Sequence, residues 1–408
     1  MKKYIFSLAS SFLIVQLSAQ VNPAFLRLEV KDSDSIKLNM DATYNRPFLR
    51  SEKLPITIGG HAEVNYQYLQ EDGINEGHQF QMRRTSLFIS TSIANRFSFL
   101  SEIEFEDGAK EINIEFAALD FEISPLLIMR AGIVVNPIGA FNQNHDGPKW
   151  DFVDRPISAT QLLPATFSNV GFGIYGKNSN QNWAYGYEFY LTNGLNDRLI
   201  ANEESKTFLP AVKADANRFE ESFNGSLLTT AKFTVRKNAI GELGLSWMGG
   251  NYNKYQEDGF KLDKRRRADV FAVDFNTKIS KINTTITSEW AWIKVNIPET
   301  YTEQFGENQQ GGVVDFVTPL FRCKIFGIEK SILNAGLRVE YVDWNKGKFK
   351  TTNGNIAEDV FSIVPAISWR PTAETVFRIN YRYNWQRDIL GNPPAKMAGI
   401  QIGVATYF

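Results

Sequence analysis

The last twelve residues, Met397 to Phe408, read MAGIQIGVATYF, and their side chains alternate in character. One set is mostly apolar, with Ile400, Ile402 and Val404, whereas the other is mostly small or polar. A period of two residues with one apolar face predicts a β-strand that meets a hydrophobic medium on one side. Such a strand must be paired or leave an open edge, and a closed barrel removes the edge. We therefore expect an all-β fold in which this strand pairs with the first strand.

The start of the chain has the pattern of a secretory signal peptide. Two lysines follow Met1, an apolar stretch runs to Leu17, and the small Ala19 precedes a polar residue. This pattern predicts a signal peptide over residues 1–19, with a short buried strand as the alternative. Residues 20–55 contain three prolines and a mixed pattern, which we interpret as a periplasmic leader that could enter the lumen. The barrel is expected over residues 56–408.

The composition limits the class of protein. No window after Gln20 holds the roughly 18 apolar residues that a spanning helix needs. A content of 43% hydrophobic and 22% charged residues excludes a helical membrane bundle but suits a barrel, because only alternate residues face lipid. Without Lys2 and Lys3 the chain has 42 basic and 45 acidic residues, which does not indicate nucleic-acid binding. The single cysteine, Cys323, excludes an internal disulfide and a cysteine-based zinc site.

Strand signals recur from residue 56 to the last residue. Sixteen strands are predicted, at about 56–68, 79–93, 97–106, 111–123, 126–135, 167–177, 182–193, 223–236, 239–250, 267–280, 282–295, 312–325, 332–344, 358–370, 375–387 and 396–408. Short turns alternate with mostly longer connections, which is typical of a transmembrane antiparallel β-barrel with short periplasmic turns and long extracellular loops. In the clearest strand, Ile379 and Tyr381 should face lipid. Arg378 and Arg382 should face water and be replaceable by alanine without loss of folding.

A soluble β-sandwich also alternates, so it is the main alternative fold. Its inner face would be a dense aliphatic core. Here the apolar face is rich in tryptophan and tyrosine near strand ends, as at a membrane interface, and the other face is charged in mid-strand. These features favour a wall between lipid and a wet lumen. Sixteen strands enclose an aqueous channel unless something fills it.

Four stretches resemble one known family. They are FQMRRTSLFIS (Phe80–Ser90), FSFLSEIEFEDG (Phe97–Gly108), FAALDFEISPLLIMRAGIVVNPIGAF (Phe116–Phe141) and LLPATFSNVGFGIYG (Leu162–Gly176). They are similar to the phosphate-selective porin O/P family, in the branch common in Bacteroidetes. The resemblance implies a 16-stranded porin of the Gram-negative outer membrane, usually a homotrimer, with a third loop folded into the pore. The last strand, ending in Phe408, resembles the signal read by the barrel-assembly machinery.

The inward parity predicts the pore lining. The basic residues on that face are Arg84, Arg130, Lys232, Arg236, Lys278, Arg322, Lys324, Arg338, Arg378 and Arg382. Acidic residues share the face, so the charges could act on solutes or pair across strands. The third loop, 136–166, carries apolar residues and prolines, and we expect it to fold inward and form the constriction. Asp146, Lys149, Asp154 and Arg155 would lie at the eyelet. No lysine cluster like that of the phosphate channels is present.

Neither catalysis nor a cofactor is predicted. None of the three histidines has outward parity within a predicted strand, where a barrel lipase would need one. His145 and Asp146 lack a third ligand at helical or hairpin spacing, so no metal site is predicted. The sequence thus predicts a passive pore for small hydrophilic solutes, including anions such as phosphate. The alternatives are a plugged, substrate-specific barrel and a structural barrel whose surface loops bind a partner protein.

Overall fold

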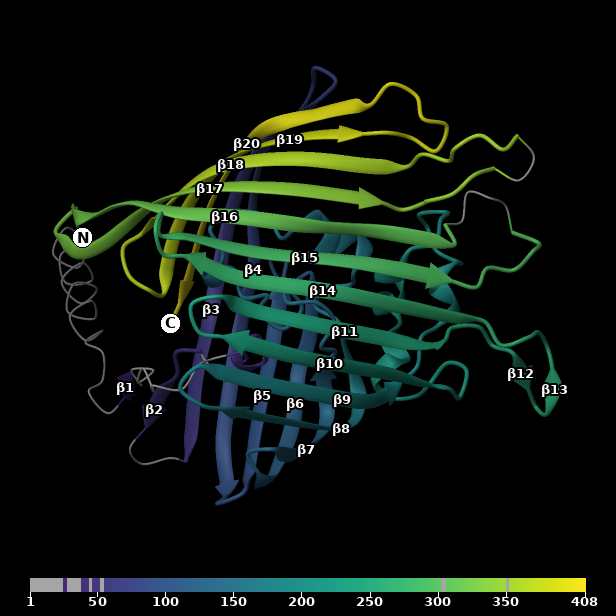
Figure 1. The fold of residues 1–408 in the computed structure, drawn as a ribbon, viewed down its shortest axis with the longest axis horizontal. Helices are drawn as coiled ribbons and strands as arrows, with labels where there is room; N and C mark the ends of the chain where they lie inside the picture. Colours follow the sequence, from purple (N-terminus) through teal and green to yellow (C-terminus); the bar gives the residue numbers. More distant parts are fainter. Residues whose placement is uncertain (1–24, 28–37, 44–45, 52–54, 302–305, 350–351) are drawn as a thin grey trace, which may run out of the picture.

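The structure is a computed structural model that describes residues 25–27, 38–43, 46–51, 55–301, 306–349 and 352–408. One antiparallel sheet of eighteen strands dominates it, and sixteen of these strands form a closed wall (Figure 1). The other two, β1 (Phe25–Arg27) and β2 (Leu49–Ser51), form a short extension that pairs with the start of the wall. The predicted fold class and strand number are confirmed.

The wall strands follow the order of the chain. The first eight are β3 (Ile56–Glu71), β4 (Ile74–Ala94), β5 (Phe97–Glu106), β6 (Glu111–Ser124), β7 (Leu127–Val135), β8 (Ser168–Ser179), β9 (Trp183–Asn193) and β10 (Leu227–Lys237). The next eight are β11 (Gly241–Asn251), β14 (Arg267–Ile279), β15 (Thr284–Val295), β16 (Asn308–Ile325), β17 (Ile328–Asp343), β18 (Asp359–Arg370), β19 (Thr375–Gln386) and β20 (Ala395–Tyr407). Each strand pairs with its neighbour in sequence, and β20 pairs with β3.

The remaining elements are short and lie in the connections. They are η1 (Asn39–Asp41), η2 (Gly147–Lys149), η3 (Ser158–Leu162), η4 (Asp197–Leu199), η5 (Leu209–Ala214), η6 (Ala216–Phe219) and the small hairpin of β12 (Gln256–Glu257) and β13 (Phe260–Lys261). No helix among the described residues is long and apolar enough to cross a membrane.

The closing strand β20 has the facing that its sequence predicts. Val404 lies opposite Val64 and Gln401 opposite Gln67 in the register with β3. Ile400 and Ile402 are exposed on the outer surface, whereas Gln401 and Ala405 are buried inside. Since side chains alternate along a strand, one apolar set thus lies outside and one small or polar set lies inside.

The first hairpin is longer than predicted. The sequence places the strand ends near residues 68 and 79, but β3 and β4 continue to a two-residue turn at Asp72 and Gly73. Both turn residues have positive φ, of 46° and 85°, as a tight hairpin turn requires. The sequence between the predicted ends is polar, so it lacks the apolar alternation that marks a strand in contact with lipid. The strands continue there because backbone pairing does not need an apolar face.

The outer surface carries aromatic side chains near both ends of the strands. At the long-loop end, the ring centroids of Tyr383 and Trp385 are 4.3 Å apart, and those of Trp290 and Tyr341 are 6.2 Å apart. At the short-turn end, Trp369 stacks on Phe377 at 5.2 Å. Exposed aliphatic residues such as Ile367 and Ile379 lie between these groups. This order matches an apolar belt bounded by aromatic girdles.

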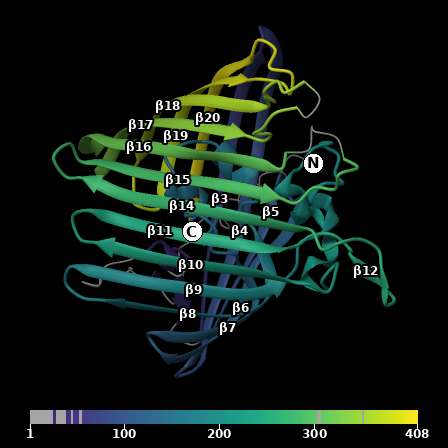
Figure 2. The same cartoon turned by 45° about the vertical axis from the view of Figure 1, so that its right-hand side comes forward.

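The long loops also fill part of the barrel. The connection between β7 and β8 and the connection between β9 and β10 pack against inward residues of β10, β11, β14 and β15. The resulting apolar core includes Ile138, Leu162, Leu199, Val270 and Ile293, each at most 2% exposed. Figure 2 shows helical segments from these loops gathered inside one end of the wall. Much of the lumen is therefore occupied by protein.

Candidate functional site: the lumen and the loop that crosses it

The connection between β7 and β8, residues 136–167, crosses the lumen and bonds to the opposite wall. Glu289 of β15 accepts hydrogen bonds from the backbone N–H groups of Ala140 and Phe141, at 2.6 and 3.0 Å. Asn380 of β19 accepts one from Val153 at 2.8 Å. We call this segment the inner loop. Its backbone donors are satisfied by wall side chains, which fixes its path across the barrel.

Further hydrogen bonds attach the inner loop to the wall. The Ile157 N–H donates to Glu340 of β17 at 2.7 Å, and the Lys232 ammonium of β10 donates to the Gly139 carbonyl at 2.5 Å. Polar wall residues that the sequence assigns to the pore therefore hold the inner loop. Part of the charge of these wall residues is therefore engaged in hydrogen bonds to the inner loop and not directed at solutes.

The predicted basic lining divides into two groups. Six residues are buried and lie close to a carboxylate. The shortest separation for each residue is Arg84–Glu106 3.2 Å (with Glu63 at 3.3 Å), Arg130–Asp120 2.7 Å, Lys232–Asp274 3.1 Å, Arg338–Asp315 2.7 Å, Arg378–Glu63 2.8 Å and Arg382–Glu340 3.0 Å. At these positions the lumenal charges pair across strands, which is one of the two alternatives that the sequence leaves open.

The other predicted basic residues lie nearer water. The Arg236 side chain is 41% exposed and lies 3.8 Å from Glu242. Lys278 is exposed near the end of β14. Arg322 and Lys324 are exposed beyond Val317, the last β16 residue that pairs with β15. Their strand parity is inward after a bulge in β16, but they lie on the protruding β16–β17 hairpin at the short-turn rim (Figure 1).

The four residues predicted at the eyelet separate into three anchor points. Asp146 and Lys149 lie together, with 2.9 Å between the Asp146 carboxylate and the Lys149 ammonium. Asp154 accepts a hydrogen bond from Gln401 of β20 and lies 3.7 Å from Arg382. Arg155 lies 3.6 Å from Glu104 of β5. These side chains attach the inner loop to different sides of the wall, and their effect on passing solutes remains a prediction.

The N-terminal segment contributes a residue that the sequence did not single out. Arg46 is buried, and its guanidinium donates to both Asp146 oxygens, at 2.6 and 2.9 Å. The same group lies 2.9 Å from Glu102 of β5, and its Cζ is 4.1 Å from the ring centre of Phe88. The Tyr407 hydroxyl of β20 donates to Asp146 at 2.6 Å. Only the general expectation that the leader could enter the lumen pointed toward Arg46.

Residues 38–43 and Arg46 lie across the short-turn end of the lumen, and we call them the strap. The Asn39 N–H donates to Glu242 at 2.8 Å, Asp41 forms an ion pair with Lys177, and the Lys149 ammonium donates to the Ala42 carbonyl at 3.1 Å. Two cavities of about 260 and 240 Å³ lie beside η1, one lined by Asp41, Arg130 and Lys177, the other by Asn39, Lys149 and Asp315. The strap therefore borders two cavities at this end of the lumen, each large enough for several water molecules.

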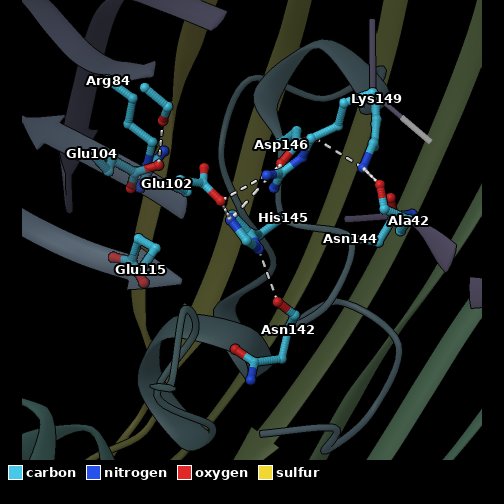
Figure 3. A network of polar contacts seen from close by, with 12 residues as sticks. Ala42, Arg84, Glu102, Glu104, Glu115, Asn142, Asn144, His145, Asp146 and Lys149 are labelled. Carbon is cyan, nitrogen blue, oxygen red and sulfur yellow. Dashed lines mark hydrogen bonds and ion pairs between the residues drawn. The ribbon is translucent and has the colours of Figure 1, made fainter. Parts of the chain in front are cut away.

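Charge stabilises the bond between strap and inner loop. Burial alone would raise the pKa of Asp146, but the positive charges of Arg46 and Lys149 outweigh burial, so its pKa lies well below the ordinary value. Asp146 is therefore ionised, and it accepts bonds from Arg46, Lys149 and Tyr407. Figure 3 shows Asp146 and Lys149 beside His145 and Glu102.

Comparisons with known proteins were made at the level of sequence and of fold. No family model matches the chain. An uncharacterized protein of Aquifex aeolicus (strain VF5) is 31% identical over 150 residues, which are 35% of this chain. The chain spans about a third of the length of that relative, 33%.

Solved structures match over most of the chain. OmpF of Salmonella typhi, in complex with daunomycin, has a TM-score of 0.54 at 10% identity and covers 86% of this chain and 97% of its own. The outer membrane channel DcaP of Acinetobacter baumannii has a TM-score of 0.53 at 9% identity, with the same coverage. A loop L8 deletion mutant of OmpT, an outer membrane protein of Vibrio cholerae, has a TM-score of 0.52 at 8% identity and covers 87% and 100%. At these identities the likeness concerns the fold alone, an antiparallel β-barrel that this chain shares with these outer-membrane proteins.

Proposed function

We propose that the protein is an outer-membrane channel through which small hydrophilic solutes diffuse passively. The observation that carries the proposal is the closed sixteen-strand wall, with an apolar belt outside and charged residues inside around a loop that crosses the lumen. A wall of this kind removes the hydrocarbon barrier, and its interior limits solute size and charge. Neither a catalytic role nor a cofactor is part of the proposal.

Weak charge selectivity fits the lumen better than a phosphate site. The family resemblance implies anions such as phosphate, and a ladder of unpaired arginines would support that choice. Here each of the six buried bases lies within 3.3 Å of a carboxylate. Charge neutralised in this way attracts anions weakly. We therefore propose general hydrophilic solutes as substrates, with phosphate as one member of the class.

We further propose that the protein is a homotrimer in the outer membrane. The barrel-assembly machinery would insert it after recognising the strand that ends in Phe408. The exposed apolar belt supports a lipid environment, and one neighbouring structure, OmpT of Vibrio cholerae, is itself described in a trimer form. A plugged barrel is the second candidate function. The buried bond between Arg46 and Asp146 supports it, because it ties the strap to the inner loop.

Planar-bilayer recording of the purified full chain tests these functions. Large steady current steps are the result expected for an open diffusion channel. Small or rare steps that become large and steady when residues 38–48 are deleted would favour the plugged barrel. The absence of current in both proteins, at confirmed insertion, would overturn the channel proposal in favour of a structural barrel. The reversal potential in a salt gradient then measures charge selectivity, which we expect to be weak.

A further inference from the structure

Four metal-ligating side chains lie near one another in the lumen beside the strap, and Figure 3 shows three of them, Glu102, His145 and Asp146. His61 comes from β3, Glu102 from β5, and His145 and Asp146 come from the inner loop; all are at most 1% exposed. One ligand atom from each of His61, Glu102 and Asp146 lies within 4.8 Å of the others. His145 Nε2 lies 3.8 Å from both Glu102 Oε2 and Asp146 Oδ1, and it belongs to a second group, with Glu102 and Glu104, that overlaps the first at Glu102. His145 and Asp146 lack a third ligand nearby in the sequence, because His61 and Glu102 come from the distant strands β3 and β5.

The hydrogen bonding of His145 orients one nitrogen toward the cluster. Its Nδ1 lies 2.9 Å from the Asn142 carbonyl oxygen, which can only accept, so we assign the proton to Nδ1. In the neutral ring the lone pair of Nε2 then faces two carboxylate oxygens at 3.8 Å, beyond hydrogen-bond distance. A backbone carbonyl behind one ring nitrogen is the usual support of a histidine that ligates a metal through the other.

His61 provides an independent indication. Its ring is fully buried, yet neither Nδ1 nor Nε2 has a hydrogen-bond partner. A buried polar atom without a partner costs free energy unless something else binds it. The Tyr407 hydroxyl meanwhile donates to Asp146 Oδ2, which fixes the orientation of that carboxylate. The cluster thus has oriented donors and unused nitrogen lone pairs.

Arg46 supplies the positive charge in the present arrangement. Its guanidinium contacts Asp146 Oδ1 and Glu102 Oε2, the two oxygens that face His145. These two contacts place a positive charge beside the carboxylates but leave His145 Nε2 and both His61 nitrogens without a hydrogen-bond partner. A cation that accepts nitrogen and oxygen donors together would use these nitrogens as well as the carboxylates.

We propose that His61, Glu102, His145 and Asp146 form a binding site for a divalent transition-metal ion of the Zn²⁺ type, and that Arg46 competes with the ion for this site. Two imidazoles and two carboxylates form a donor set for zinc and its neighbours rather than for magnesium or calcium, which prefer oxygen alone. Binding of the ion would break the contacts of Arg46 with Asp146 and Glu102, and it would therefore weaken the attachment of the strap to the inner loop.

The site can be tested with Co²⁺ as a spectroscopic probe in the purified, tag-free full chain. We expect Arg46→Met to bind one Co²⁺ per chain at least about tenfold more tightly than the wild type. The visible absorption band should be that of four-coordinate cobalt, and Zn²⁺ should displace it. His145→Gln or His61→Gln in the Arg46→Met background should abolish this band. Arg382→Met, which removes a buried arginine bound to Glu340, serves as the matched control and should leave Co²⁺ affinity unchanged.

Several outcomes would overturn the proposal. One is a folded Arg46→Met protein that binds no Co²⁺, or binds it independently of both histidines. Equal affinity in wild type and Arg46→Met would overturn the competition. Heat-modifiable mobility in gels reports whether each variant is folded. If Arg46→Met does not fold, Arg46→Lys keeps the charge but loses the two-pronged contact, and it should still bind Co²⁺ more tightly than the wild type. Because the readout is metal affinity, failure here leaves the channel proposal standing.

Discussion

Arg378 shows how a lumenal position can be buried rather than wet. The sequence predicts that alanine would be tolerated there, but the structure contradicts the reason for that prediction. The guanidinium pairs with Glu63 at 2.8 Å and donates to the Phe152 carbonyl at 2.7 Å and the Gly147 carbonyl at 3.1 Å. The residue is 1% exposed, because the inner loop excludes water from this part of the lumen.

We therefore expect Arg378→Ala to lower the free energy of unfolding by about 3–5 kcal/mol, since it removes the closer of two basic partners from the buried Glu63 carboxylate and a donor from two buried carbonyls. Urea titration in lipid vesicles measures the effect. Arg387→Ala is the control, because Arg387 pairs with Asp359 while its side chain is 49% exposed, and its loss should cost only about 0.2–1 kcal/mol. Equal losses for both variants would show that Arg378 is hydrated.

The lowered pKa of Asp146 predicts that the stability of the folded protein depends on pH. A carboxyl group whose pKa is lowered on folding stabilises the fold fully above its unfolded pKa, about 3.9, and loses that contribution as the pH falls further. Asp146→Asn should therefore destabilise the protein at pH 7, and its deficit relative to wild type should shrink as the pH falls below about 4. Urea midpoints of both proteins against pH provide the check. A deficit that stays constant across this range would mean that the charge of Asp146 does not stabilise the strap.

At the scale of the strand, β19 tests which face meets lipid. Ile379 is 54% exposed on the outer surface, opposite Ile402 of β20. Ile379→Arg should cost about 2–4 kcal/mol if it lies near the bilayer midplane. Tyr383→Arg, nearer the strand end, should cost roughly 0–1 kcal/mol. The same vesicle titration measures both, and a reversed ranking would place the bilayer differently along the strand.

The inner loop is the other element whose role can be measured. Deleting residues 142–151 removes Asp146 and Lys149, which bind the strap, and the Trp150 carbonyl, which accepts a hydrogen bond from Arg378 of the wall. Single-channel conductance should rise and charge selectivity should weaken. Unchanged conductance with a less stable oligomer in detergent would instead assign the loop to the rim or to a subunit contact.

Strands were predictable because an apolar outer face imposes a period of two on the sequence, as in β19 and β20. Alternation was less informative at two places: the polar end of the first hairpin at Asp72 and Gly73, and the β16–β17 hairpin, where Arg322 and Lys324 have the predicted parity but lie beyond the end of β15. The inner loop was predictable from its apolar residues and prolines. Its partners were not, because contacts such as Ile157 with Glu340 depend on register and path across the lumen, which local pattern does not encode.

At the scale of the whole molecule, closure depends on the contact between β20 and β3. The Phe408 N–H donates to the Gly60 carbonyl at 3.0 Å, and a methyl group added at Gly60 would lie 2.5 Å from the Phe408 ring. Deleting Phe408 should reduce the amount of folded barrel in outer-membrane fractions, measured by heat-modifiable mobility. Replacing the solvent-exposed Leu390 by serine serves as the control and should have no effect. Wild-type levels after the deletion would contradict the prediction.

The meeting of Arg46, Asp146 and Tyr407 also has a consequence for the order of assembly. These residues come from the strap, the inner loop and β20, and β20 follows every other wall strand along the chain. The cluster therefore cannot be completed until the last strand is in place. Contacts between such distant segments are slow to form, because a long stretch of chain must be ordered first. An unfinished barrel lacks the Tyr407 contact that helps hold the strap and inner loop together, so filling of the lumen and completion of the wall are coupled in time.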